Sequence, residues 1–166
     1  AAINGGDEER EARLLAATDV VQVGLAGTLR GFVFRSARTG RPTRGDEVGY
    51  VPGRPAGYAA EPTEALNYVD AHDNETLFDA LALKLPRDTD PEQRARANLV
   101  ALALATLGQN PVLWHAGVDV LRSKSLDRNS YDSGDWFNRF DVSGADTGFG
   151  RGLPPSADNR AAWSIT

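Results

Sequence analysis

The sequence predicts an α/β fold in which parallel strands alternate with helices. Three observations predict it: a β-type run at 68–71 turns directly into a helix, a sharply delimited helix follows at 91–107, and an apolar run occupies 111–116. Strand, helix, helix, strand is the repeat of a parallel α/β structure with adjacent strands. In α/β barrels, site residues lie where the strands end and the chain enters the next helix.

The first third of the chain predicts helix and then loop. A charged helix is expected from about Glu8 to Ala17. The segment 19–27 is ambiguous, because its valines favour a strand whereas Asp19 as an N-cap favours a short second helix, which we prefer. Residues 35–62 are rich in Gly, Pro, Arg and Thr without an apolar period, so they predict a long surface loop.

A polar corner follows the run at 68–71. His72, Asp73 and Asn74 suit the point where a strand opens onto solvent or a ligand. Asn74 is expected to cap the next helix, whose apolar stripe begins at Leu77 and which Pro86 stops. Regular structure on both sides would hold this His-Asp pair in place.

The helix at 91–107 has clear start and stop signals. Asp90 is a capping side chain, Pro91 suits the first helical position, and Gly108 ends the helix. Its second half, 99–105, is apolar almost all round and is therefore expected to be buried. The run at 111–116 is expected to be a second buried strand.

Composition excludes several classes of function. The 166 residues are 41% hydrophobic and 25% charged, which is ordinary for one soluble domain. No run approaches the roughly 20 apolar residues of a membrane span, so no membrane partner is expected. The net charge of −5 argues against nucleic acid and fits a neutral ligand such as a sugar. With no cysteine the redox compartment is undetermined, so extracellular and cytoplasmic locations are both compatible.

Residues 122–152 combine Ser, Asp, Asn, Gly and Arg with interleaved aromatic rings, among them Tyr131, Trp136 and Phe149. The stretch is too polar for a core and too aromatic for a simple linker. Rings beside hydrogen-bonding side chains suit a sugar, because one face of a pyranose is apolar and its rim carries hydroxyls.

Three segments carry a resemblance to a known family. Residues 68–77, YVDAHDNETL, resemble the last short motif of the α-amylase family of glycoside hydrolases, in the form used by pullulanases and related α-1,6-glucan debranching enzymes. Residues 121–125, LRSKS, and 129–138, NSYDSGDWFN, resemble two further segments of the pullulanase branch. The resemblance runs through most of the chain from about Asp19 onward.

The resemblance implies that residues 1–166 are the late portion of a catalytic (β/α)₈ TIM barrel, with strands 7 and 8, their helices and long loops. Residues 35–62 would be the loop before strand 7, and residues 122–166 the region after strand 8. Such a segment is expected to be incomplete alone. The implied activity is retaining hydrolysis of α-1,6-glucosidic branch linkages in pullulan, glycogen or limit dextrins, so the implied partners are an α-glucan and the rest of the parent chain.

The resemblance also implies roles for single residues. Asp73 takes the place of the carboxylate that stabilises the transition state, and His72 that of the neighbouring histidine that binds the sugar. The family's aspartate nucleophile and acid glutamate are not found in this chain, and glycoside hydrolysis requires two carboxyl groups. The segment alone is therefore expected to be inactive.

Five further residues are candidates for sugar contacts. Trp136 and Phe137 are expected to pack within their loop. Arg122 and Lys124 fit ordinary surface charges, although the resemblance of their segment to the family raises them slightly as functional residues. The five candidates, four of them in the loop that would line the substrate cleft, are Asn74, Tyr131, Asp132, Asp135 and Arg139.

The resemblance and the composition also bear on the parent protein and its cofactors. No organic cofactor is implied; calcium is common in the family, but no ligand set is visible here. The chain has no methionine, begins with Ala1 and stops after Thr166, which together with the resemblance leads us to expect a segment of a longer protein.

Two alternatives from other classes remain open. One is a metal site assembled from His72, Asp73, Glu75, Asp79 and His115, because imidazole and carboxylate are competent ligands, although no regular ligand spacing appears. The other is a non-catalytic carbohydrate-binding module. Such modules are usually β-sandwiches, so predominantly β structure would favour that alternative.

Overall fold

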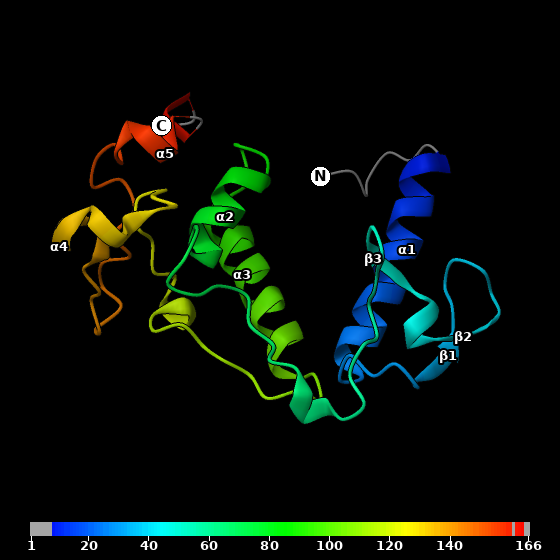
Figure 1. The fold of residues 1–166 in the computed structure, drawn as a ribbon. Coiled ribbons are helices and arrows are strands. Elements are labelled where there is room, and N and C mark those ends of the chain that lie inside the picture. Colours follow the sequence, from blue (N-terminus) through cyan, green and yellow to red (C-terminus); the bar gives the residue numbers. More distant parts are fainter. Residues whose placement is uncertain (1–7, 161, 165–166) are drawn as a thin grey trace. The chain divides into compact units, whose positions relative to one another are not determined.

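The computed structural model describes residues 8–160 and 162–164, and Figure 1 shows their helices and strands in chain order. These residues form two compact units. The first contains the described residues up to Asn67 together with Leu104–Leu113, and the second contains Tyr68–Ala103 together with the described residues from Trp114 onward. Each unit is described in turn.

The first unit begins with one long helix, α1, Glu8–Leu25, where the sequence predicted a helix followed by an ambiguous segment. Asp19 does not cap a second helix. It lies inside α1 with 4% of its surface exposed, and its carboxylate accepts hydrogen bonds from Ser36 Oγ and the Ala37 N–H, each at 2.6 Å. Asp19, which the sequence indicated as a helix cap, therefore holds the turn that follows strand β1, Val33–Arg35, against α1.

The loop predicted at 35–62 contains regular structure, which corrects the prediction. Two antiparallel hairpins and two short 3-10 helices form in and beside it. Three-residue strands are too short to leave a visible alternation of apolar and polar residues, which explains why the pattern indicated a loop. The elements are β1 Val33–Arg35, which pairs with β2 Pro42–Arg44, β3 Gly49–Val51, which pairs with β4 Arg54–Pro55, and the 3-10 helices Gly45–Glu47 and Pro62–Glu64.

The core of the first unit joins α1 to these hairpins. Val23, fully buried on α1, packs with Val48 and Ala56, and Val20 and Phe34 cover the cluster. Close backbone contacts between the turns allow this packing. A Cβ at Gly57 would lie 2.6 Å from the carbonyl carbon of Gly45, so neither turn could approach the other with a larger residue at that position.

Neither predicted strand is an extended strand in the structure. Among the described residues, one isolated parallel bridge, Asn67 to Val112, joins the residue just before the first run to the second run, and neither run contains a strand. The Asn67 N–H donates to Pro111 O and the Leu113 N–H donates to Asn67 O, both at 2.9 Å. Val112 and Leu113 are 39% and 44% exposed rather than buried. The predicted parallel direction is confirmed, whereas the predicted length and burial are wrong, because a buried ladder needs neighbouring strands on both sides.

The second unit contains helix α2, Leu77–Lys84, and most of helix α3, Pro91–Thr106, which lie side by side in Figure 1. Leu77, Leu102 and Val118 form the buried cluster between them. Asp90 behaves as predicted, because its carboxylate accepts the N–H of Gln93 at 2.9 Å. The cap of α2 differs from the prediction: Thr76, not Asn74, accepts the N–H of Asp79.

The burial predicted for the second half of α3 is only partly observed. Leu102 and Ala105 are buried, but Leu99 is 64% and Val100 59% exposed. One face of the helix therefore packs on the elements described here and the other does not.

After residue 116 the chain runs through loops with short helical turns: the 3-10 helices Val118–Val120 and Ser130–Asp132, helices α4 Gly134–Asn138 and α5 Ser156–Asn159, and the 3-10 helix Ala162–Ser164. The strands of the described chain form only the two small hairpin sheets, so the usual architecture of a carbohydrate-binding module is not found there. None of the described helices has both the length and the apolar character needed to cross a membrane.

Candidate carbohydrate site

The His-Asp corner, residues 72–75, lies in the second unit just before α2. The side chains of His72 and Asp73 are 88% and 79% exposed, and His72 Nε2 lies 3.6 Å from Asp73 Oδ2. Asn74 has a φ of +60°, a left-handed conformation that Asn tolerates better than most residues. The backbone therefore turns sharply at the corner and leaves the Asp73 carboxylate facing solvent.

Two buried side chains fix the backbone on either side of this corner. Asp70 Oδ2 accepts the N–H of Leu77 at 2.9 Å, which ties the residue before the corner to the first residue of α2. Thr76 Oγ1 accepts the N–H of Asp79 at 3.2 Å, which caps the helix. Asp70 and Thr76 are 6% and 1% exposed, so water does not compete strongly for these bonds.

A buried polar cluster, formed by Asp79, Ser123 and Lys124, supports the corner. Asp79 is fully buried and accepts hydrogen bonds from Ser123 Oγ at 2.5 Å and from the Lys124 N–H at 2.8 Å. Burial raises the pKa of Asp79, and these hydrogen bonds oppose the rise. Burial likewise lowers the pKa of Lys124, while the carboxylates of Asp127 and Asp79 act in the opposite direction.

Lys124 was predicted to be a surface charge, yet it is only 2% exposed. A buried lysine in an otherwise polar segment leaves no signal in hydropathy or spacing. Its place in the segment 121–125, one of the three that carry the resemblance, was the available hint.

The Asp73 carboxylate lines two depressions in this unit, with volumes of about 230 Å³ and 490 Å³, which share Asp73, Arg128 and Asn129. Tyr131, 86% exposed, stands at the first, and Asn74 at the second. The structure thus brings four of the sequence-predicted site residues together. It adds residues that sequence reasoning did not single out: Arg128, Asn129, Ser130, Asn138 and Asp158.

The backbone N–H groups of Arg128 and Asn129 are held by two buried side chains, Asn159 and Asp127. Asp127, fully buried, accepts the N–H of Asn129 and the amide of Asn159, each at 3.0 Å. Asn159 Oδ1 in turn accepts the N–H of Arg128 at 2.9 Å. Arg128 then reaches the corner, with its Nη2 3.5 Å from Asn74 Oδ1.

The remaining predicted contact residues lie elsewhere on the loop. Asp135 and Arg139 line a separate depression of about 420 Å³ together with Trp136 and Asn138. Asp132 is exposed at the end of its 3-10 helix and is not among the residues that line these three depressions. Asn138 lines both the depression of Asp135 and Arg139 and the smaller depression that contains Asp73 and Tyr131.

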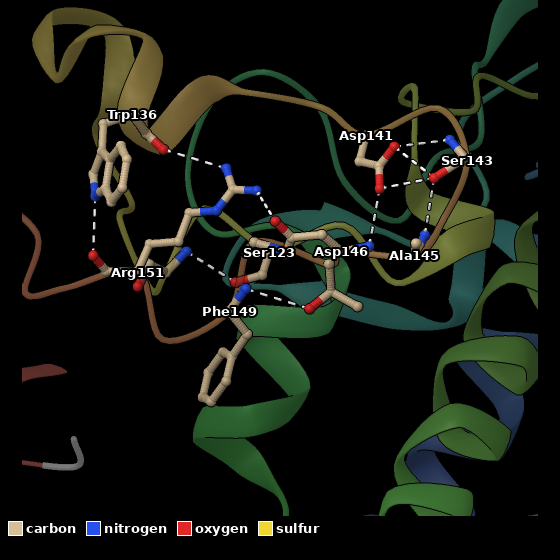
Figure 2. Close-up of polar contacts among 11 residues, drawn as sticks. Ser123, Trp136, Asp141, Ser143, Ala145, Asp146, Phe149 and Arg151 are labelled. Carbon is tan, nitrogen blue, oxygen red and sulfur yellow. Dashed lines mark hydrogen bonds and ion pairs between the residues drawn. The ribbon is translucent and has the colours of Figure 1, made fainter.

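Figure 2 shows how the aromatic loop between Trp136 and Arg151 is held in shape. Trp136 Nε1 donates to Arg151 O at 2.9 Å, and the Arg151 guanidinium donates back to Trp136 O at 3.4 Å and to Asp146 Oδ2 at 2.5 Å. The hydrogen bond from Arg151 holds the pKa of Asp146 below its usual value. Trp136 is 62% exposed, so it supports the loop through its indole N–H and leaves part of its ring free to meet a ligand.

His115 and Arg122 form a second polar group behind the corner. His115 Nδ1 lies 3.7 Å from Asp70 Oδ2, and Arg122 Nη1 lies 3.5 Å from His115 Nε2. Arg122 also donates to Asn138 O at 2.7 Å and stacks 5.5 Å from the centre of the Phe140 ring. Arg122 therefore connects His115 to the aromatic loop through Asn138 and Phe140, and it is not the surface charge that was predicted.

The surroundings of His115 predict a loss of stability in acid. Burial lowers the pKa of His115 below 6.5, and nearby Arg122 and Lys124 lower it further, while Asp70 opposes them. The folded state therefore binds fewer protons than the unfolded state as pH falls through 6.5, so the free energy of unfolding decreases there. We expect His115→Gln to lose less stability than the wild type between pH 7 and pH 5 in thermal unfolding. An equal loss in both proteins would contradict this assignment.

The chemistry of the corner suits a neutral polyol. One carboxylate, an imidazole, two amides, a phenol, a hydroxyl and the Arg128 guanidinium line the smaller depression, and these groups can donate to and accept from sugar hydroxyls. Among the described residues no group of three or more His, Asp or Glu side chains is placed to hold a metal ion. The described residues therefore do not assemble the alternative His/carboxylate metal site.

Comparison with known proteins places this chain among homologues of glycoside hydrolases. More particularly, the chain is homologous to one region of pullulanases, so the resemblance read from its three segments is confirmed. It is 42% identical over 162 residues to pullulanase 1 of Arabidopsis thaliana chloroplasts and 44% identical over 155 residues to the pullulanase of Klebsiella aerogenes. These alignments cover 98% and 93% of the chain. No family model matches the chain.

Solved structures give the same result. The crystal structure of Klebsiella pneumoniae pullulanase complexed with maltotriose matches 93% of the chain with a TM-score of 0.88 and 42% identity. The chain spans only about 17% and 14% of the length of the two curated relatives, and 14% of that crystallised chain. The fold of this region is therefore that of the matching part of a pullulanase.

Proposed function

We propose that the protein carrying this chain hydrolyses α-1,6-glucosidic branch linkages in pullulan, glycogen or limit dextrins with retention of configuration. In this proposal Asp73 stabilises the transition state and His72 binds the sugar at the same subsite. The observation that carries it is the exposed Asp73 carboxylate, held at a sharp backbone turn in a depression lined by hydrogen-bonding side chains. The homology to pullulanases supports the choice of linkage.

The location of Asp73 also supports the proposed fold of the parent. A corner between the Asn67–Val112 parallel bridge and the start of α2 is where the seventh strand of a (β/α)₈ barrel would meet its helix. The predicted strands at 68–71 and 111–116 would then complete their ladders with strands from the rest of the parent. In the run at 111–116, Val112 is 39% and Leu113 44% exposed, which is consistent with a strand that pairs with further strands of the parent.

The chemistry requires two more carboxyl groups. Retaining glycosidases use one carboxyl as nucleophile and a second as acid and base, about 5–5.5 Å apart. Asp73 is the carboxylate that lines the smaller depression, and at the proposed site it would stabilise positive charge that develops on the sugar ring. The nucleophile and the acid are proposed to come from the rest of the parent, so this segment alone is expected to be inactive.

The loop residues are proposed to bind further sugar units. Tyr131 and Trp136 expose rings that can pack against the apolar face of a pyranose. Asp132, Asp135 and Arg139 present charged groups for its hydroxyls, and Asn74 lies next to Asp73. The crystallised relative from Klebsiella pneumoniae is described with bound maltotriose, which is consistent with an oligosaccharide as the ligand.

The test is an assay of the full-length protein on pullulan and on amylose, which differ in carrying α-1,6 linkages. We expect hydrolysis of pullulan, little action on amylose, and α-anomeric products when the first turnovers are followed by NMR. Preferential cleavage of amylose would contradict the linkage, and β-anomeric products would contradict retention. Saturable glucan binding without any turnover would instead favour a binding module.

A further inference from the structure

Lys124 is buried, although no carboxylate of the described residues forms a direct ion pair with its ammonium group. It is 2% exposed, whereas the other lysine of the chain, Lys84, is exposed at the end of α2. Lysine is rarely buried so completely, because its ammonium loses hydration. The free energy of that loss must be offset by specific hydrogen bonds.

Those hydrogen bonds flank Asp73. Lys124 Nζ donates to the carbonyl oxygen of His72 at 3.3 Å and to that of Asn74 at 2.7 Å. The peptide unit that precedes Asp73 and the one that follows Asn74 are thereby joined through one ammonium group. Among the described residues, the polar contact of the Asp73 side chain is the 3.6 Å approach to His72, so its direction depends on its backbone.

The backbone of Lys124 is anchored independently of the corner. Its N–H donates to Asp79 Oδ2 at 2.8 Å, and the neighbouring Ser123 Oγ donates to the other oxygen of the same carboxylate. Asp79 belongs to the first turn of α2, which Thr76 caps. Lys124 therefore spans from the capped start of α2 to the turn of the corner, where Asn74 has the left-handed φ of +60°.

From this geometry we infer that Lys124 is a positioning residue for Asp73: it fixes the His72 and Asn74 carbonyls so that the carboxylate meets the reacting sugar. The inference rests on the proposed function, because it assigns to Lys124 a role that acts through Asp73. Lys124 does not line the depressions that Asp73 lines, so a direct contact with the sugar is not part of the role.

The experiment compares Lys124→Met with the control Lys84→Met in the full-length protein on pullulan. Because a displacement of about 1 Å can cost about a hundredfold in rate, we expect Lys124→Met to lower kcat by about ten- to a hundredfold with little change in KM. Lys84→Met should match the wild type. Rates are referred to folded protein, measured by thermal unfolding, since a purely structural role would reduce the folded fraction and leave kcat of the folded molecules unchanged.

Lys124→Gln provides a second variant that retains a donor on a shorter side chain. It should show a smaller loss of kcat than Lys124→Met. Wild-type kcat in either folded variant would overturn the inference, and so would failure of both variants to fold, because Lys124 would then be required for folding rather than for positioning.

A double-mutant cycle with Asp73→Asn separates positioning from a general disturbance. The readout is the Kd of a cationic imino-sugar that mimics the charge of the transition state. Lys124→Met should weaken binding by about tenfold when Asp73 is present and have little effect in the Asp73→Asn background, consistent with a role through Asp73. Equal weakening in both backgrounds would overturn the inference.

The two proposals fail in different ways. Near-normal turnover of Asp73→Asn would refute the proposed function. An inactive Asp73→Asn together with a Lys124→Met variant of normal kcat would refute only the role of Lys124.

Discussion

Replacement of Asp73 by asparagine in the full-length protein is expected to abolish turnover of pullulan while the protein still folds. The change removes a negative charge but keeps the size of the side chain. Loss of one preorganised electrostatic group typically costs about a hundred- to a thousandfold in kcat, and we expect at least the upper figure here.

Folding should survive because the Asp73 side chain is 79% exposed and its polar contact in the described part of the chain is with His72, itself 88% exposed, at 3.6 Å. Surface substitutions of this kind change the free energy of unfolding by no more than about 0.5 kcal/mol. The measurements are kcat on pullulan and the thermal unfolding midpoint, and a matched control is Asp88→Asn, an exposed aspartate in the connection between α2 and α3. A variant that turns over at near-normal rate would refute the assigned role.

The second large effect is expected on stability. Asp79→Ala should lower the free energy of unfolding by about 3 kcal/mol, because it leaves buried donors without an acceptor. Asp79 is fully buried and accepts hydrogen bonds from Ser123 Oγ and the Lys124 N–H. Alanine would also remove one of the carboxylates that favour the charge of the buried Lys124 ammonium, and Asp127 would remain.

Denaturant unfolding of the wild type, Asp79→Ala and the exposed control Asp88→Ala measures this difference. The control should differ from the wild type by no more than about 0.5 kcal/mol. If Asp79→Ala were as stable as its control, the buried cluster of Asp79, Ser123 and Lys124 would not stabilise the corner. Asp79 would then not anchor the backbone of Lys124.

Local sequence signals predicted the helices well because the residues that begin and end a helix act on their near neighbours. Asp90, Pro91 and Gly108 delimit α3 to within two residues of the prediction. The cap of α2 was misplaced by two residues, since Asn74 and Thr76 are both competent caps and only the turn at the corner decides between them. The hairpins within 35–62 were missed because their strands are held by backbone pairing rather than by a side-chain pattern.

The residues of the candidate site likewise divide into those that the sequence indicates and those that only the structure brings to the site. The His72-Asp73 pair and Tyr131 could be singled out because they lie in segments with a recognisable order of residue types. Arg128, Asn138 and Asp158 could not, because their relation to Asp73 depends on how the loops fold back over distances of tens of residues in sequence. The burial of Lys124 and the partial burial of Arg122 were predicted incorrectly for the same reason.

By itself, the sequence determined the helix boundaries of α3, the parallel direction at Asn67 and Val112, and the identity of Asp73 as the candidate carboxylate. The helix boundaries depend on short-range order, the parallel direction follows from the order of strands and helices along the chain, and Asp73 was assigned through the resemblance of its segment. Only the tertiary structure decided which charges are buried, that Thr76 caps α2, and that Lys124 holds the carbonyls beside Asp73. Burial and long-range hydrogen bonds arise from packing between segments that the linear pattern does not bring together.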